Sequence, residues 1–292
     1  MFDVNSGQQL YQLSGHDTVL GDEYGVSVDI SGTRAIVGAL STNTGKAYVY
    51  DLTNGTQITS LISDDASPND LFGVAVAIDG TTALVGARYD DDFDTASGSA
   101  YCLMLSRASN CTKLNAHDAA WGDRFGMYLD LDGNTALVAS RYDDDERKSS
   151  GSAYLFDVDT GLERYKLVAD DMNANDHFGS SISLSGNFAL IGAANDYDFV
   201  PFGGSAYIFD VHSGQQVLKL FPQDPGVLDQ FGTAVSLDGN RALVGAMQSA
   251  FDGSVNATGK AYVYDLNLVP EPSAAFPMLL GLTFLAWIGR RK

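Results

Sequence analysis

Residues 178–207, FGSSISLSGNFALIGAANDYDFVPFGGSAY, contain the pattern that decides the fold. An aromatic-Gly pair begins an alternating stretch, a Ser-Gly pair follows as a two-residue turn, and an apolar run then ends in Gly-Ala. A Gly-Ser-Ala-Tyr segment starts the next strand. Because alternation is typical of a half-buried strand and an unbroken apolar run of a strand covered on both faces, the stretch predicts consecutive antiparallel strands.

The same three landmarks recur along the chain. The aromatic-Gly pair occurs five times, and its glycines are 48, 53, 53 and 53 residues apart: Gly25, Gly73, Gly126, Gly179 and Gly232. Gly-Ala follows thirteen residues later in four copies, and the third copy has Ala139-Ser140 there. Glycine turns such as Asn54-Gly55 lead to a fourth strand. Four antiparallel strands in a unit of about 50 residues predict the blades of a β-propeller.

The predicted fold class is therefore all-β, with five blades over residues 1–267, or seven if the chain is an N-terminally truncated fragment. The first residues align with the end of a third strand and with a fourth strand, whereas the fifth copy stops after its third strand. We expect the N-terminal strand to complete the last blade and remove an exposed edge. Met1-Phe2-Asp3 lacks the features of a signal peptide, so we expect a longer reading frame with a signal peptide upstream.

These motifs resemble the FG-GAP repeat, in a short-turn bacterial form related to that of integrin α-chain propellers. The resemblance rests on the Asp-x-Phe-Gly, Ala-Leu-Val-Gly-Ala and Gly-Ser-Ala-Tyr segments and covers residues 1–267. Integrin-type repeats imply a calcium loop between the Phe-Gly and Gly-Ala strands. Only a tight turn such as Ile78-Asp79-Gly80-Thr81 occupies that interval here, so the calcium site of the family is not expected at that place.

The C-terminal end is a different kind of segment. Residues 268–272 form a Pro-Glu-Pro linker, and residues 273–292 combine an uncharged stretch, long enough for a helix of about 25 Å, with a basic end. This order resembles the PEP-CTERM sorting signal. The resemblance implies a transient transmembrane anchor in the inner membrane of a Gram-negative bacterium, cleavage by an exosortase, and delivery to the cell surface or extracellular space; an ordinary tail anchor is the alternative. The residues that carry it are Val269, Pro270, Glu271, Pro272, Arg290, Arg291 and Lys292.

Two sets of aspartates follow the repeat in all five copies. They lie three and eight residues before the anchor glycine, and we expect both to accept hydrogen bonds from backbone N–H groups in the turns between blades, with ligand binding as the alternative. The nearer set is Asp22, Asp70, Asp123, Asp176 and Asp229, and the farther set is Asp17, Asp65, Asp118, Asp171 and Asp224.

A further acidic set follows the Gly-Ala strand in the three central copies. Closely spaced carboxylates are typical ligands of Ca²⁺, the one cofactor that the sequence suggests. The glycine and terminal glutamate of a full calcium loop are missing, so a solvated acidic loop stays open as the alternative. The candidate ligands are Asp90, Asp92, Asp94, Asp143, Asp145, Asp196 and Asp198.

The two cysteines, Cys102 and Cys111, flank the turn between the third and fourth strands of one blade. In an exported protein they predict a disulfide, and two buried thiols are the alternative.

Composition and the absence of catalytic motifs in the sequence exclude several classes of function. With 17 basic and 37 acidic residues and a net charge of −20, the chain lacks the clustered positive charge that nucleic acids require. It has no nucleophile elbow, phosphate-binding glycine loop or His-Glu-x-x-His motif. We therefore expect a non-enzymatic adhesion or scaffold protein that contacts extracellular polysaccharide or surface proteins. The alternative is a carbohydrate-active hydrolase on a five-bladed propeller.

Overall fold

The structure is a computed structural model that describes residues 1–41, 43–65, 67–105, 110–247 and 259–268. Within these ranges the chain forms β-strands and one short 3-10 helix at its end, which confirms the all-β prediction. The elements are β1 (Tyr24–Ser31), β2 (Arg34–Ala39), β3 (Lys46–Asp51), β4 (Thr56–Leu61), β5 (Phe72–Asp79), β6 (Thr82–Ala87), β7 (Ser99–Met104), β8 (Asn110–Leu114), β9 (Tyr128–Asp132), β10 (Thr135–Ser140), β11 (Ser152–Asp157), β12 (Glu163–Leu167), β13 (Phe178–Ser185), β14 (Phe188–Ala193), β15 (Ser205–Asp210), β16 (Gln216–Leu220), β17 (Phe231–Asp238), β18 (Arg241–Ala246), β19 (Lys260–Asp265) and η1 (Leu266–Leu268).

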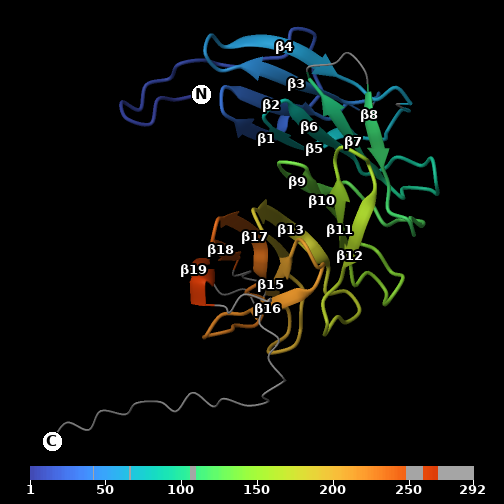
Figure 1. Cartoon of the computed structure of the whole chain (residues 1–292), viewed down its shortest axis with the longest axis vertical. Helices are drawn as coiled ribbons and strands as arrows, with labels where there is room; N and C mark the ends of the chain where they lie inside the picture. The colour runs from blue at the N-terminus through green and yellow to red at the C-terminus, as the bar shows by residue number, and fades with distance from the viewer. Residues whose placement is uncertain (42, 66, 106–109, 248–258, 269–292) are drawn as a thin grey trace, which may run out of the picture.

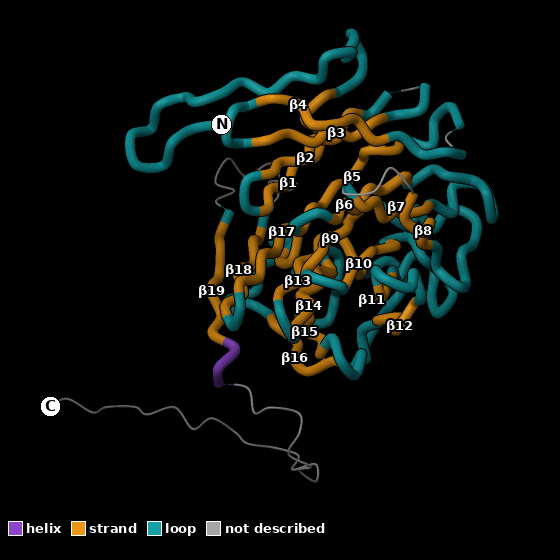
Figure 2. The backbone as a smooth tube through the Cα atoms, turned by 45° about the horizontal axis from the view of Figure 1, so that its top comes forward, coloured by secondary structure: helices purple, strands orange, loops and turns teal. Residues whose placement is uncertain are grey.

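The strands form five antiparallel sheets in chain order. Four sheets have four strands each, and the last, β17-β18-β19, has three among the described residues. The first strand of each sheet packs against the first strand of the next, from β1 through β5, β9 and β13 to β17. The sheets therefore follow one another around a shared axis, as Figures 1 and 2 show, in the manner of propeller blades.

The glycines of the repeat mark the places where neighbouring sheets touch. A Cβ atom on Gly86, near the end of β6, would lie 2.0 Å from the carbonyl oxygen of Gly126, two residues before the first strand of the next sheet. Gly126 itself has a φ of 84°, in the left-handed region that favours glycine. Gly192 stands in the same relation to Gly232. The aromatic-Gly and Gly-Ala landmarks thus recur together because they meet across each junction between sheets.

The aromatic residue of each anchor pair lies in the core. Phe125 is fully buried and meets the ring of Tyr154 in its own sheet edge-on, with ring centroids 5.5 Å apart. Phe178 and Tyr207 form the equivalent pair, with tilted rings whose centroids are 5.6 Å apart. The packing fixes the tyrosine ring and places its hydroxyl at one edge of the sheet. We call this edge, where the first strand of each sheet begins and the second strand ends, the loop edge.

The N-terminal segment does not complete the last sheet, contrary to our expectation. It forms its own hairpin, in which Phe2 pairs with Gln9 and the amino group of Met1 donates to the carbonyl of Tyr11. The Tyr11 hydroxyl donates to the carbonyl of Thr53, so the hairpin is held beside the first sheet. β12 contacts the fourth sheet in the same way, through the Tyr165 hydroxyl and the carbonyl of His212.

The predicted sorting signal and transmembrane helix, residues 269–292, lie outside the described residues. In the part of the chain that is described, no helix is long and apolar enough to span a membrane.

Candidate functional site

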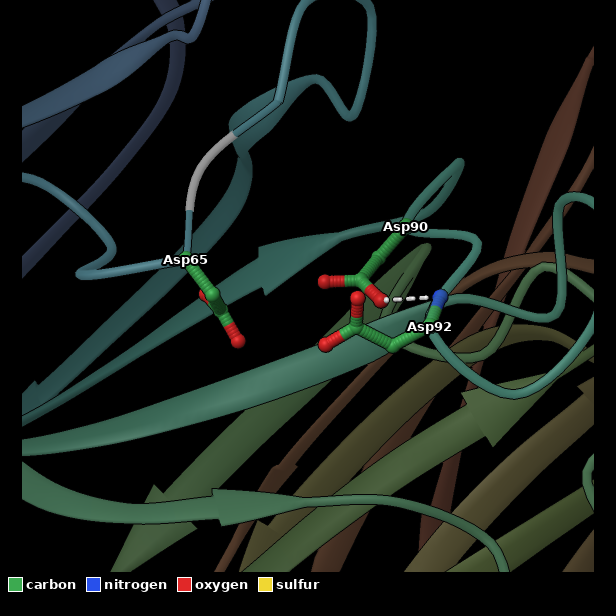
Figure 3. Close-up of side chains that lie close together, drawn as sticks. All are labelled: Asp65, Asp90 and Asp92. Atoms are coloured by element: carbon green, nitrogen blue, oxygen red, sulfur yellow. Dashed lines mark hydrogen bonds between the residues drawn. The ribbon is translucent and has the colours of Figure 1, made fainter.

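A cluster of three carboxylates, a tyrosine and a lysine lies at the loop edge of the second sheet. Asp65 precedes β5, and Asp90 and Asp92 follow β6, and their carboxylates point toward one another in Figure 3. Tyr101 of β7 stands directly opposite Lys113 of β8, so both side chains leave the same face of the sheet. The Lys113 Nζ lies 2.8 Å from Asp65 Oδ2, 2.9 Å from Asp90 Oδ2 and 2.5 Å from Asp92 Oδ2.

Asp90 is the most enclosed member of the cluster, with only 2% of the residue exposed. The Tyr101 hydroxyl is 2.6 Å from Asp90 Oδ2 and 2.8 Å from Asp65 Oδ1 and bridges the two carboxylates. The backbone N–H of Asp92 donates to Asp90 Oδ1 at 3.2 Å (Figure 3). The buried carboxylate is therefore paired with a cation and hydrogen-bonded on both oxygens, as a buried charge requires.

The third and fourth sheets carry the same cluster in the same register. The Nζ of Lys166 lies 2.6, 2.9 and 3.1 Å from oxygens of Asp118, Asp143 and Asp145. The corresponding distances from Lys219 to Asp171, Asp196 and Asp198 are 2.7, 2.9 and 2.6 Å. The bridging hydroxyls belong to Tyr154 and Tyr207.

The protonation equilibria follow from this geometry. Burial alone would lower the pKa of Lys113, but hydrogen bonds to Asp65, Asp92 and Asp90 outweigh it and raise that pKa. Likewise, burial opposes ionisation of Asp65, and the hydrogen bond from Lys113 overcomes it and lowers the carboxyl pKa. Burial and the Asp90 hydrogen bond raise the pKa of the Tyr101 phenol. In this cluster the Asp65 carboxyl is therefore ionised, the Lys113 amine protonated and the Tyr101 phenol neutral.

The first and last sheets have a smaller version of this cluster. In the first sheet, Asp17 contacts the ammonium of Lys46 and accepts a hydrogen bond from the Tyr48 hydroxyl. In the last sheet, Asp224 makes the equivalent contacts with Lys260, at 2.6 Å, and with Tyr262. The lysine here lies on the third strand, two residues before the tyrosine, instead of on the fourth strand.

The central clusters are arranged as a cation site. Three carboxylate oxygens, one each from Asp65, Asp90 and Asp92, lie within 4.8 Å of one another, and the equivalent group of the third sheet meets the same limit. The Lys113 ammonium is hydrogen-bonded to all three carboxylates and takes the place of a shared cation. Ca²⁺ takes six to eight oxygen ligands. Each triad offers only three carboxylates, and these already contact an ammonium. The triad therefore does not fit a Ca²⁺ ion while the lysine side chain occupies the centre of the cluster.

The Asp-x-Asp pairs named from the sequence do enter the clusters, but Asp94 does not. Its carboxylate accepts a hydrogen bond from the backbone N–H of Thr95 instead. Sequence reasoning missed the lysines and tyrosines and gave the farther aspartates a backbone role. A signal was present, because Lys113, Lys166 and Lys219 are each 53 residues apart, as the tyrosines opposite them are.

The nearer set of repeated aspartates lies in the turns before the anchor pairs. Each accepts a hydrogen bond on Oδ2 from a backbone N–H three residues earlier, as in the 2.7 Å contact between Ala120 and Asp123. Burial raises the pKa of Asp123 and of Asp176 to about 7. The other members of this set make the same contact: Asp22, Asp70 and Asp229.

A row of alternating cationic and aromatic side chains crosses the loop edge of the second and third sheets. The guanidinium carbon of Arg124 lies 5.2 Å from the ring centroid of Tyr89 and 4.6 Å from that of Tyr142. Arg88 lies over Tyr89 and Arg141 over Tyr142, at 5.0 and 4.9 Å. Distances of this size allow cation–π attraction. We call these five residues the Arg-Tyr row.

The arginines of the Arg-Tyr row form no ion pair with a carboxylate in the described part of the chain. Among the described residues, the one arginine that forms an ion pair with a carboxylate is Arg164, outside the row. The Nε atoms of Arg88 and Arg141 are buried without a hydrogen-bond partner. Exposed aromatic side chains lie in the loops of the same edge: Phe93, Trp121, Tyr197, Phe199 and Phe221.

The predicted disulfide stays a prediction. Cys102 is buried in β7, and Cys111 belongs to β8, the strand paired with it. The side chain of Cys111 lies outside the described part of the chain.

Repeated four-stranded sheets joined at glycine contacts, with acidic clusters at one edge, define a propeller-type repeat protein. The FG-GAP repeat model matches residues 8–50, 56–103, 109–156, 162–209 and 215–264, and the chain belongs to this family. Each of the last four matched segments contains the last strand of one sheet and three strands of the next, and the first contains the first three strands of the first sheet. The search of curated proteins finds no match.

Proposed function

We propose that this chain is an exported, non-enzymatic interaction protein of a bacterial surface or extracellular matrix, and that it binds acidic polysaccharide at its loop edge. The observation that carries this proposal is the Arg-Tyr row. In a chain with a net charge of −20, three arginines at one edge without a carboxylate partner favour an anionic ligand. A guanidinium matches a carboxylate in a planar, bidentate fashion.

The surroundings of the row support a binding surface. Arginine and aromatic residues are enriched in binding interfaces and contribute much of the binding energy there. Trp121, the most exposed of the aromatic residues at this edge, lies in the loop that leads to Arg124. Phe199 and Phe221 stack with ring centroids 4.5 Å apart. Sugar rings with carboxylate groups would find both flat apolar surfaces and guanidinium groups here.

The carboxylates of the central clusters support a non-catalytic role, because each is already bonded to a lysine. One observation favours a hydrolase as the second candidate. Asp123 and Asp176 have pKa values raised to about 7, a range that suits a general acid. Both are buried and bonded to the backbone of their turns, so a substrate could not reach them without rearrangement.

The C-terminal residues give the route of export in this proposal. An exosortase would cut near Pro270-Glu271-Pro272 while the following apolar stretch holds the chain transiently in the inner membrane. Mass spectrometry of the mature protein tests this point, since we expect a C-terminus close to Pro272. A mature chain that still ends at Lys292 would contradict it.

Binding is tested with immobilised neutral and uronate-containing polysaccharides, together with an assay for reducing ends. We expect retention on the uronate polymers without release of sugar, and loss of retention for Arg124→Gln. The control is Arg34→Gln, which removes an arginine bonded to the carbonyl of Gly80 at the opposite edge. Release of sugar would support the hydrolase, and binding to surface proteins alone would assign the other class of partner.

A further inference from the structure

We propose that Lys113, Lys166 and Lys219 are built-in cations that take the place of Ca²⁺ in the central sheets. Each supplies, from inside the chain, the positive charge that its acidic cluster needs. The sheets then hold their loop edge together without a metal ion. This inference rests on the clusters alone and does not depend on the ligand of the Arg-Tyr row.

The first support is the match between donors and acceptors. A lysine ammonium has three N–H donors and no acceptor. In each cluster its Nζ lies within 3.1 Å of three carboxylates from three different positions in the chain. Lys113 and Lys219 use all three donors, and Lys166 donates to Asp118 and Asp145 and forms an ion pair with Asp143, so no carboxylate of a triad is left without the cation.

The second support is that acids and lysine occur as a set. The first sheet has Thr42 and Thr44 in place of the Asp-x-Asp pair. In its fourth strand, the residue opposite Tyr48 is Ser60, whereas the central sheets have a lysine at this position. The one remaining carboxylate, Asp17, is paired with Lys46 from another position. The lysine of the fourth strand is therefore present where three carboxylates converge and absent where they do not.

The third support is burial. Asp143 and Asp196 are each 2% exposed, as is Asp90. A buried carboxylate that loses its counter-charge is strongly destabilising. A metal ion would leave these carboxylates unpaired whenever its concentration fell. A tethered ammonium pairs them at every Ca²⁺ concentration.

A consequence follows for the lysine-free cluster. Lys166→Met keeps much of the apolar stem and removes the ammonium, so Asp118, Asp143 and Asp145 face one another with their oxygens within 4.8 Å. Such a triad needs an external cation. We therefore expect this single change to make the third sheet dependent on Ca²⁺.

The test is thermal melting of the full chain in EDTA and in millimolar Ca²⁺, with calorimetric titration of Ca²⁺ beside it. We expect wild type to melt at the same temperature in both and to give no saturable heat. Lys166→Met should melt lower in EDTA and recover in Ca²⁺. The control, Lys148→Met, removes the same charge from an exposed lysine in the loop that carries Asp143 and Asp145, outside the cluster itself, and should not respond.

Two results would overturn the proposal. One is a wild-type chain that melts lower in EDTA or binds Ca²⁺ saturably, and this measurement needs no variant. The other is a folded Lys166→Met variant that responds to EDTA and Ca²⁺ no differently from Lys148→Met.

Discussion

The central and terminal sheets are built from one repeat, but their aspartates are paired with lysines from different strands. In the third sheet, Lys166 reaches across from the fourth strand to three carboxylates, and one of them, Asp143, is buried. In the last sheet, Lys260 reaches a single exposed aspartate, Asp224. The comparison shows that the fourth strand carries a lysine where three carboxylates converge, and that a single carboxylate is paired with a lysine of the third strand instead.

The same contrast holds for the apolar residues. Ile78 in β5 is 3% exposed, whereas Ile30, at the same repeat position in β1, is 69% exposed. Leu190 in β14 is fully buried, and Leu243 in β18 is 44% exposed. An equivalent residue is therefore core or surface according to whether a sheet lies on each side of it, as in repeat proteins in general.

The largest expected effect concerns the anchor aromatic. Phe125→Ala should lower the free energy of unfolding by about 3–5 kcal/mol, because it leaves a cavity between two sheets. Tyr24→Ala, at the same position of the first sheet, should cost clearly less, since Tyr24 is only half-buried. Denaturant unfolding measures both. Equal losses would show that the first sheet is packed as tightly as the central ones.

The next effect concerns the lysines in metal-free buffer. Lys166→Met should cost about 3 kcal/mol of unfolding free energy, the lower end of the range for a broken buried ion pair, because it leaves the buried Asp143 carboxylate without its counter-charge. Lys260→Met should change it little, because its ion pair lies at the surface. Chemical denaturation in EDTA compares the two variants. A cost for Lys260→Met as large as that for Lys166→Met would remove the distinction between the two kinds of cluster.

A smaller effect is expected for the bridging tyrosines. Tyr154→Phe removes hydrogen bonds of 2.9 and 2.6 Å to Asp118 and Asp143 and should cost about 1.5–2 kcal/mol. Tyr262→Phe removes one bond to the exposed Asp224 and should have a minor effect. Urea titrations of both variants provide the comparison. No loss for Tyr154→Phe would mean that the lysine alone supports the buried carboxylate.

The smallest effect is a pH dependence. Burial, with the charge of Arg141, lowers the pKa of His177 to about 4 from an ordinary 6.5. Between these values the unfolded chain takes up a proton that the folded chain does not, so stability falls as the pH drops from 6.5 toward 4. His177→Gln copies Gln230 of the last repeat and should remove a loss on the order of 1 kcal/mol. Melting curves at several pH values test this, and parallel curves for the two proteins would contradict it.

Much of the fold could be predicted because its determinants are periodic. The pairing of Gly86 with Gly126 across a junction leaves a fixed spacing in the sequence. The place of the N-terminal strand could not be predicted this way, since alignment with a fourth strand does not say which sheet it joins. In the structure, the Tyr11 hydroxyl donates to the carbonyl of Thr53 in the turn before β4 and so holds the N-terminal segment beside the first sheet.

Only part of the acidic clusters and of the Arg-Tyr row could be predicted from the sequence. Asp90 and Asp92 are two residues apart in the chain, so their spacing suggests a shared ligand. Asp65 and Lys113 reach them only through the sheet register, from 25 residues before and 23 residues after Asp90. Within the Arg-Tyr row, Arg88-Tyr89 and Arg141-Tyr142 follow the repeat at a spacing of 53 residues, but Arg124, which joins the two pairs, has no arginine at the equivalent position of another copy.

The most direct test of the central claim is the titration of the lysine side chains by nuclear magnetic resonance. If Lys113, Lys166 and Lys219 are the cations of the clusters, hydrogen bonds to the carboxylates raise their pKa values. Their ammonium signals should then persist well above a pH of about 10.4, the ordinary lysine value. Deprotonation of these three lysines at or below that pH would show that they do not act as cations within the clusters.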